Sequence, residues 1–317
     1  MNTGLRTAAF AVVLTASILS VPRAAASLQG APVAERVTVG RRHIYLACAG
    51  TAHSKRPTVI LVSGYHDSSD PWTGAGNLAL LPQAVGPVVF AGLSRTGRVC
   101  AYDRPGTLRY ETGFPLTQRS TPVAQPRTVR DLAGELHALL AAAHVPAPYV
   151  LVGHSLGGLI ALLYARTYPS GVRGIVFVDA FSPALPAKLG DLWPLYRAVL
   201  NPPAARQPIA ALKEAASETV DIETSLLQVR SAPPLRKMPL IVLTKTEPFR
   251  IPPDSLPPGI TAPEIDRAYA EAQNDLVNLA PSTPHVFATG SEHYIQLSQP
   301  DLVIEAVQLI IRRAFSS

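Results

Sequence analysis

The stretch Tyr149-Val-Leu-Val-Gly-His-Ser-Leu-Gly-Gly-Leu-Ile-Ala-Leu-Leu-Tyr-Ala-Arg-Thr-Tyr168 decides how this 317-residue chain folds. It opens with the apolar run Tyr149 to Val152, which is typical of a buried strand. From Leu156 onward, apolar residues recur at helical spacing until Pro169 ends the pattern. The sequence therefore predicts a strand, a sharp turn and a helix, with Gly-His-Ser-Leu-Gly at the turn.

This turn has the properties of a site for a nucleophile. A serine between a strand and a helix adopts strained backbone angles, and the chain passes too close for side chains at the flanking glycines, Gly153 and Gly157. The turn presents the Ser155 hydroxyl outward. The N–H of Leu156, at the positive end of the helix, is placed to donate to an oxyanion formed when the serine attacks a carbonyl group.

The motif in this context resembles the nucleophile elbow of the α/β-hydrolase superfamily, which it matches at Gly153, Ser155, Gly157 and Gly158. The resemblance implies an α/β fold with a mostly parallel eight-stranded sheet and helices on both faces. It also implies a helical cap inserted after the sixth strand, at about residues 182–238, in a hydrolase domain that spans residues 27–317. It implies no cofactor and no metal.

The strands and helices expected around the elbow follow the order of such a domain. The first two strands, Glu35 to Gly40 and His43 to Gly50, should pair antiparallel at the sheet edge. The remaining strands are expected at 57–63, 99–102, 149–152, 174–180, 239–244 and 284–289, and helices at 78–84, 128–143, 211–218, 262–279 and from Pro300 onward.

The N-terminus indicates export. A short basic start is followed by the apolar run Thr7 to Val21 and by Ala24-Ala25-Ala26, the small residues that a signal peptidase requires. We expect residues 1–26 to be a signal peptide and the mature protein to be secreted or extracytoplasmic; a retained anchor is the alternative.

Composition limits the partners. The formal net charge is +6 and falls to +4 when Arg6 and Arg23 leave with the signal peptide. The basic residues are scattered, which argues against nucleic acid as a partner and allows at most weak binding to anionic surfaces.

Cys48 and Cys100 are the two cysteines. Two residues are too few for a metal site. If the resemblance holds, they lie on the second and fourth strands, which are neighbours in the hydrolase sheet, so a disulfide can form in an exported protein. Two separately buried thiols are the alternative.

The resemblance also implies a second oxyanion donor in the loop after the strand 57–63. Relatives have His-Gly there, whereas this chain has Ser63-Gly64, and position alone indicates the N–H of Tyr65. We expect His66 and Asp67 to be loop residues that shape or gate the pocket.

A second loop resembles a motif of these hydrolases. Asp103-Arg104-Pro105-Gly106 is similar to the Asp-Arg-x-Gly that follows their fourth strand, where it is an ionic clamp on the loop. We therefore do not count Asp103 as catalytic.

The base and the acid of a catalytic triad come from later in the chain. His293 lies in the loop after the last strand, where the superfamily keeps its base, whereas His154 is expected to point away along the elbow. The acid is usually found after the strand 239–244, but the nearest match there, Glu247, fits the pattern poorly. Asp179, at the carboxyl end of the preceding strand, is the preferred acid and Glu247 the alternative.

These residues predict a serine hydrolase without a cofactor or metal, most simply one that cleaves small carboxylic esters or other acyl substrates through an acyl-enzyme. Two alternatives stay open. One is a hydrolase-like protein that binds a hydrophobic ligand with little turnover, and the other is an amidase or aminopeptidase of the same fold.

Overall fold

The structure is a computed structural model that describes residues 33–53, 56–74, 85–107, 109, 118–202, 216–251 and 255–315. Three predictions lie wholly or mostly outside these residues. They are the signal peptide 1–26, the helix 78–84, and the helix 211–218, of which residues 211–215 are not described.

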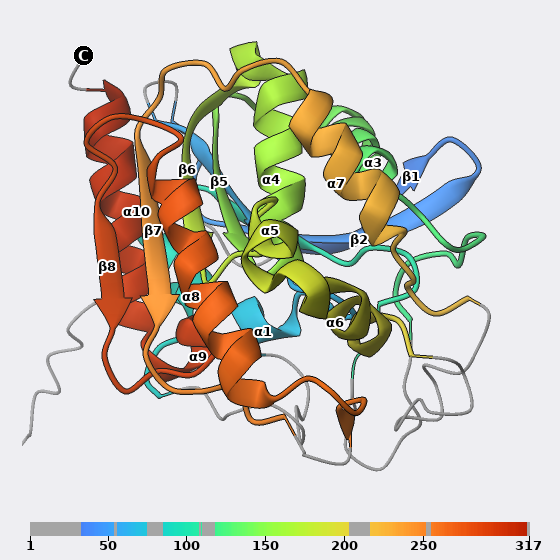
Figure 1. Ribbon diagram of the computed structural model, residues 1–317. Coiled ribbons are helices and arrows are strands. Elements are labelled where there is room, and N and C mark those ends of the chain that lie inside the picture. Colours follow the sequence, from blue (N-terminus) through green and yellow to red (C-terminus); the bar gives the residue numbers. More distant parts are fainter. Residues whose placement is uncertain are drawn as a thin grey trace, which may run out of the picture.

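A single eight-stranded sheet forms the centre of the molecule (Figure 1). Its order is β1-β2-β4-β3-β5-β6-β7-β8. The strands are β1 (Val33–Val39), β2 (Arg42–Ala49), β3 (Thr58–Val62), β4 (Val99–Tyr102), β5 (Tyr149–His154), β6 (Val172–Val178), β7 (Leu240–Lys245) and β8 (His285–Ala288).

The sheet is mostly parallel. Strand β2 pairs antiparallel with both β1 and β4, and the pairings from β4 across to β8 are all parallel. The carboxyl ends of β3, β5, β6, β7 and β8 therefore meet at one edge, where α/β sheets place their chemistry. The predicted number of strands and their mostly parallel arrangement are confirmed.

Helices cover both faces, as predicted. One apolar core cluster packs α3 (Val129–Ala142), α4 (Leu156–Thr167), α5 (Leu185–Leu189), α6 (Trp193–Leu200), α7 (Ile222–Ser231) and α8 (Ala262–Val277) against the sheet. The other contains residues of α1 (Asp70–Thr73), α2 (Val89–Ser94), α9 (Ile295–Ser298) and α10 (Pro300–Phe315).

Local sequence explains where the helices begin and end. Helix α3 starts with a capping box, in which the Asp131 N–H donates to the Thr128 hydroxyl at 3.3 Å and the Thr128 N–H donates to the Asp131 carboxylate at 2.8 Å. Helix α10 begins at Pro300, a favourable first helical position. Among the described residues no helix is long and apolar enough to cross a membrane.

Alternation along β5 sorts its side chains between the two faces. Leu151 belongs to the cluster under α3 and α4, whereas Val150 and Val152 belong to the cluster under α2 and α10. The strand continues to His154, two residues beyond its predicted end. By the same alternation, the His154 side chain is directed to the α2 and α10 side.

The segment predicted as a cap, residues 182–238, contains several helices among its described residues. It contains α5, α6 and α7, together with the short 3₁₀ helix Gly190–Leu192 between α5 and α6. Helix α5 packs against α8, and the Trp193 indole N–H donates to Glu223 at 2.8 Å. That this segment acts as a cap stays a prediction.

A disulfide links the two antiparallel neighbours near the sheet edge. Cys48 of β2 and Cys100 of β4 lie directly opposite each other in the strand register, with their Cα atoms 4.1 Å apart. Their sulfur atoms are bonded. The strand assignment from which the pairing was inferred is therefore correct.

Candidate active site

Ser155 occupies the turn between β5 and α4 in a strained conformation, with φ of 50° and ψ of −123°. Such a positive φ is costly for a residue other than glycine and needs support from its surroundings. The end of β6 provides it: the Ser155 N–H donates to the Val178 carbonyl at 3.2 Å, and the Ser155 carbonyl accepts from the Phe181 N–H at 2.8 Å. Hydrogen bonds on both sides thus fix the serine main chain.

Close packing at Gly157 brings the start of α4 against the end of β3. A Cβ atom at this position would lie 2.1 Å from the Val62 carbonyl oxygen and 2.7 Å from that of Ser63, so only glycine fits. The N–H of Leu156, in the first turn of α4, has no acceptor within the helix. Its neighbour Gly157 packs against Val62 and Ser63, which lead into the loop of Tyr65.

Asp179 and His293 meet at the carboxyl edge of the sheet. Asp179 directly follows β6 with φ of 39°, and its side chain is completely buried. Its Oδ2 atom lies 2.6 Å from Nδ1 of His293, and its Oδ1 atom accepts the Lys245 N–H at 3.2 Å. Because an ionised carboxylate only accepts, Nδ1 of His293 carries the hydrogen and Nε2 is left as an acceptor.

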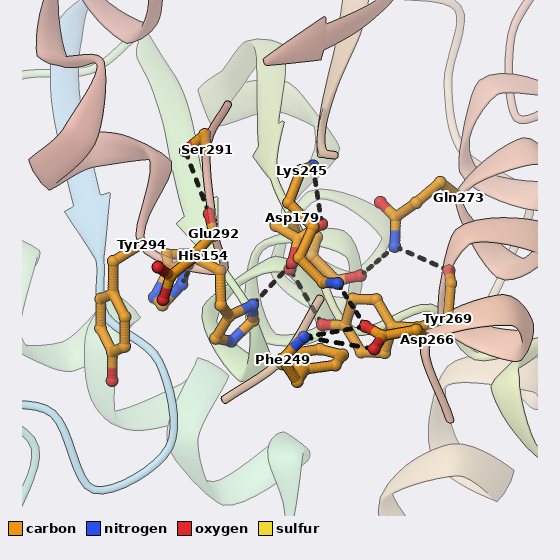
Figure 2. A network of polar contacts seen from close by, with 12 residues as sticks. His154, Asp179, Lys245, Phe249, Asp266, Tyr269, Gln273, Ser291, Glu292 and Tyr294 are labelled. Atoms are coloured by element: carbon orange, nitrogen blue, oxygen red, sulfur yellow. Dashed lines mark hydrogen bonds and ion pairs between the residues drawn. The ribbon is translucent and has the colours of Figure 1, made fainter. Parts of the chain in front are cut away.

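Glu247, the alternative acid, lies elsewhere. It is exposed, and its carboxylate accepts from the Thr246 hydroxyl at 3.4 Å. At the end of β7, near the position where the resemblance places the acid, Lys245 pairs with Asp266 (Figure 2). The structure brings Asp179, and not Glu247, to His293.

A buried ion pair supports the loop that contains Tyr65. Arg104 binds Glu218 through two hydrogen bonds, and both side chains are inaccessible to solvent. Arg104 also donates to the carbonyls of Ser63 at 2.9 Å and Gly64 at 2.5 Å. Burial alone would raise the pKa of the Glu218 carboxyl, but the guanidinium holds it below its usual range.

Hydrogen bonds of the Tyr65 side chain also anchor this loop. The Tyr65 hydroxyl hydrogen-bonds to Asn201 and accepts the Val220 N–H at 2.9 Å, so the ring is anchored to the segment 182–238. The ring stacks on His66 at 3.9 Å. The expected ionic clamp is thus formed by Arg104 with Glu218, whereas Asp103 pairs with Arg119.

Comparison with known sequences places this geometry in a family. Residues 59–306, most of the chain, match the family described as the Alpha/beta hydrolase family. The chain belongs to the α/β hydrolase family. The elbow, the parallel sheet and the residues at its carboxyl edge are the features that this membership explains.

Two curated relatives of this α/β hydrolase match about half of it. An uncharacterized protein of Schizosaccharomyces pombe is 32% identical over 46% of this chain and 28% of its own length. A protein of Escherichia coli O6:H1, named "Putative carbamate hydrolase RutD", is 27% identical over 46% of this chain and 44% of its own length. The matched region thus spans less than half of either relative.

Solved structures resemble nearly the whole chain. A thermophilic esterase from Thermogutta terrifontis has a TM-score of 0.54 and 18% identity, covering 90% of this chain and 99% of that one. The haloalkane dehalogenase DatA from Agrobacterium tumefaciens C58 has a TM-score of 0.56 and 16% identity, covering 89% and 97%. At these identities the likeness shows the fold alone.

Two aromatic residues at the site of this α/β hydrolase were not expected from its sequence. The Tyr269 hydroxyl on α8 donates to the Asp179 carbonyl at 2.9 Å (Figure 2). The Phe249 ring lies 5.0 Å from the His293 ring. Helical periodicity marks Tyr269 as buried, but nothing in the sequence indicates which residues it contacts.

His154, which was expected to point away along the elbow, contacts the residue expected to be the base, which the sequence did not indicate. Its imidazole is buried, 4.5 Å from the His293 ring, and its Nε2 atom lies 3.0 Å from the His293 carbonyl oxygen. The reason is the longer β5 strand, whose alternation directs His154 toward the loop that carries His293.

Proposed function

We propose that this chain is a serine hydrolase that cleaves carboxylic esters through an acyl-enzyme, with Ser155 as nucleophile, His293 as base and Asp179 as the acid that orients the base. The observation that carries this proposal is the 2.6 Å contact between His293 Nδ1 and the buried Asp179 Oδ2, beside a serine held at a strained elbow. In this proposal the three residues have the roles of a Ser-His-Asp triad, namely nucleophile, base and orienting acid.

In the first half of the reaction, the Ser155 Oγ attacks the ester carbonyl carbon while its proton passes to Nε2 of His293. Asp179 accepts the Nδ1 hydrogen and stabilises the imidazolium that results. The oxyanion of the tetrahedral intermediate is bound by the N–H groups of Leu156 and Tyr65. The carbon–oxygen bond then breaks, the proton passes from His293 to the alcohol oxygen, and the alcohol leaves.

In the second half, a water molecule gives its proton to His293 Nε2 as its oxygen attacks the acyl carbon. The bond to Ser155 breaks, and the serine oxygen recovers the proton from His293. The products are one carboxylic acid and one alcohol, with water as the co-reactant, and the free enzyme is restored.

The choice of oxyanion donors is supported by the packing around Gly157 and by the anchoring of the Tyr65 loop. A structure of the enzyme bearing a phosphonate on Ser155 tests it. The phosphoryl oxygen is expected within hydrogen-bond distance of both N–H groups. An oxygen that contacts neither group would refute the assignment.

An ester is the substrate class that the similar proteins favour. One solved neighbour is described as an esterase, and one relative carries the name of a carbamate hydrolase. An ester and a carbamate both contain a carbonyl carbon that is bonded to a second oxygen atom. A panel of activated esters graded in acyl length, run beside the matching anilides, separates an esterase from the amidase alternative.

We further propose that residues 1–26 are removed on export. The Cys48 to Cys100 disulfide supports this, because such bonds persist in oxidising compartments outside the cytoplasm. Mass spectrometry of protein recovered from the culture medium is expected to give an N-terminus at Ser27. Recovery only from membranes, with the leader intact, would favour the anchor.

A fluorophosphonate probe tests the mechanism most directly. Wild-type protein is expected to be labelled at Ser155 and to hydrolyse esters, while folded Ser155→Ala should do neither. Wild-type-like hydrolysis by Ser155→Ala would contradict the mechanism. Absence of both labelling and hydrolysis in folded wild-type protein would favour a ligand-binding protein.

A further inference from the structure

His154 holds the main chain of the proposed base through one ring nitrogen. Its Nε2 atom lies 3.0 Å from the carbonyl oxygen of His293. Because a carbonyl only accepts hydrogen bonds, Nε2 must carry the hydrogen, and in a neutral ring Nδ1 is then an acceptor. Within the described part of the chain, no hydrogen-bond partner reaches this buried Nδ1 atom.

The nearest carboxyl group to Nδ1 belongs to Asp67. Its Oδ2 atom is 3.8 Å away, and it too is buried without a hydrogen-bond partner among the described residues. The other oxygen, Oδ1, accepts from the Tyr294 hydroxyl at 3.3 Å. Two buried polar atoms thus face each other just beyond hydrogen-bond distance, although an unpaired buried atom of this kind is destabilising.

Gly64 makes the approach of Asp67 and His154 possible. A Cβ atom on Gly64 would lie 2.9 Å from Asp67 Oδ2 and 2.9 Å from His154 Nδ1. Arg104 fixes the Gly64 carbonyl, so the loop presents Asp67 to His154 from a held main chain.

We propose that Asp67 and His154 form a positioning pair behind the triad, in which a protonated Asp67 donates to Nδ1 of His154 and the Nε2–H of His154 holds the His293 carbonyl. The inference rests on the proposed function, because its purpose is to keep His293 in place. It makes Asp67 and His154 positioning residues that act through His293 and do not touch the substrate.

The electrostatic surroundings favour this protonation state. Burial raises the pKa of the Asp67 carboxyl from 3.8 to about 7, with Arg104 opposing the rise. Burial and the neighbouring His293 lower the pKa of His154 well below 6.5. Below neutral pH the proton is therefore on Asp67, and His154 is neutral.

Other ionisable groups also face this pair. The charge of Arg104 is largely compensated by Glu218, and that of Asp70 by Arg119 and Arg109. The remaining groups are Tyr294, which donates to Asp67, His293, and His66, which follows Tyr65 in the same loop.

Loss of the Asp67 proton changes the contact. Above the pKa of about 7, a carboxylate oxygen would face the acceptor Nδ1, and two acceptors repel. The support for the His293 main chain then weakens. We therefore expect kcat to fall on the alkaline side of the pH profile, because Asp67 loses its proton there.

Two substitutions at Asp67 test this. Asp67→Asn keeps a hydrogen donor at every pH, so its kcat should match that of wild type below neutral pH and lack the alkaline fall. Asp67→Leu has no donor, and its kcat should be about tenfold lower throughout, with KM unchanged. A merely structural role would lower the melting temperature of both variants and leave the shape of the pH profile unchanged.

Glu292 provides a matched control. It neighbours His293 in the chain but pairs with the exposed Arg250. Glu292→Gln should keep the wild-type pH profile. The same alkaline fall in Asp67→Asn as in wild type, with folding intact, would overturn the proposal.

A measurement without turnover keeps the result separate from the proposed function. In Ser155→Ala, infrared difference spectra with and without Asp67→Asn should show the C=O stretch of a protonated carboxyl group, which disappears as pH rises through about 7. No such band below neutral pH would overturn the pair even if the triad works. A band in Ser155→Ala, together with folded wild-type protein that hydrolyses no ester, would retain the pair and reject the triad.

Discussion

Nδ1 of His293 lies 2.6 Å from Oδ2 of Asp179, although the two residues follow strands β8 and β6, which are separated by β7. The contact therefore crosses the end of the intervening strand. Strand β7 contributes its main chain to it, because the Lys245 N–H donates to the second oxygen of Asp179. Three adjacent strands thus jointly set the orientation of the imidazole.

We predict that Asp179→Asn lowers kcat for ester hydrolysis by up to about four orders of magnitude, because the amide no longer selects the tautomer in which Nδ1 carries the hydrogen. Glu247→Gln is the matched control and should keep kcat within about twofold, since exposed substitutions of this kind have small effects. Steady-state kinetics measure both, with thermal melting to check folding. Collapse of the glutamate variant and survival of the aspartate variant would make Glu247 the acid.

We predict that Tyr269→Phe lowers kcat about tenfold while the protein stays folded. The hydroxyl donates to the Asp179 carbonyl at 2.9 Å, and one such hydrogen bond contributes about 1 kcal/mol. Steady-state kinetics and the rate of fluorophosphonate labelling measure the effect. An unchanged labelling rate would show that the hydroxyl does not influence the nucleophile.

We predict that Glu218→Gln destabilises the protein by about 3 kcal/mol, because it leaves the buried Arg104 charge uncompensated. Glu223, which pairs with Arg197 at the surface, is the control, and Glu223→Gln should cost less than about 1 kcal/mol. Urea denaturation measures both. Equal losses of unfolding free energy would show that the buried Arg104 pair contributes no more to stability than a surface pair.

The Glu218 pair should also contribute to acid unfolding. Because the folded-state pKa of Glu218 lies below its ordinary value of 4.5, its contribution to stability is present above that value and is lost as the pH falls through the folded-state pKa. Wild-type stability should therefore decrease below pH 4.5 more steeply than that of Glu218→Gln. Parallel curves would contradict this assignment.

We predict that replacing both cysteines by alanine lowers the free energy of unfolding by about 4 kcal/mol, from the chain entropy of the 52-residue separation between them. Denaturation with and without a reductant provides the control, since the reductant should destabilise wild type only. Intact mass after alkylation checks the bond. Two alkylated thiols in protein from an oxidising compartment would rule it out.

The sequence was sufficient for features that depend on neighbouring residues. The elbow at Ser155 could be predicted because a strand, two glycines and an apolar helix follow one another within twenty residues. The eight strands could be predicted from their apolar runs, with boundaries that differ from the structure by one or two residues at most ends.

Features that depend on distant residues could not be predicted. Arg104 and Glu218 are 114 positions apart, and nothing in the sequence near either residue indicates the other as its partner. For the same reason, the sequence could not decide between Asp179 and Glu247. Both follow strands at the correct sheet edge, and only the three-dimensional distance to His293 distinguishes them. The direction of the His154 side chain could not be predicted, because β5 is two residues longer than expected and includes His154.

The order of the strands has a consequence for when activity can arise during synthesis. In the proposed triad, the nucleophile and the acid follow β5 and β6, whereas the base follows β8, the last strand of the chain. A nascent chain that has not yet reached residue 293 would hold a serine without a proton acceptor. In the proposed mechanism, hydrolysis can therefore begin only after the final strand has docked, and its onset would report completion of the sheet.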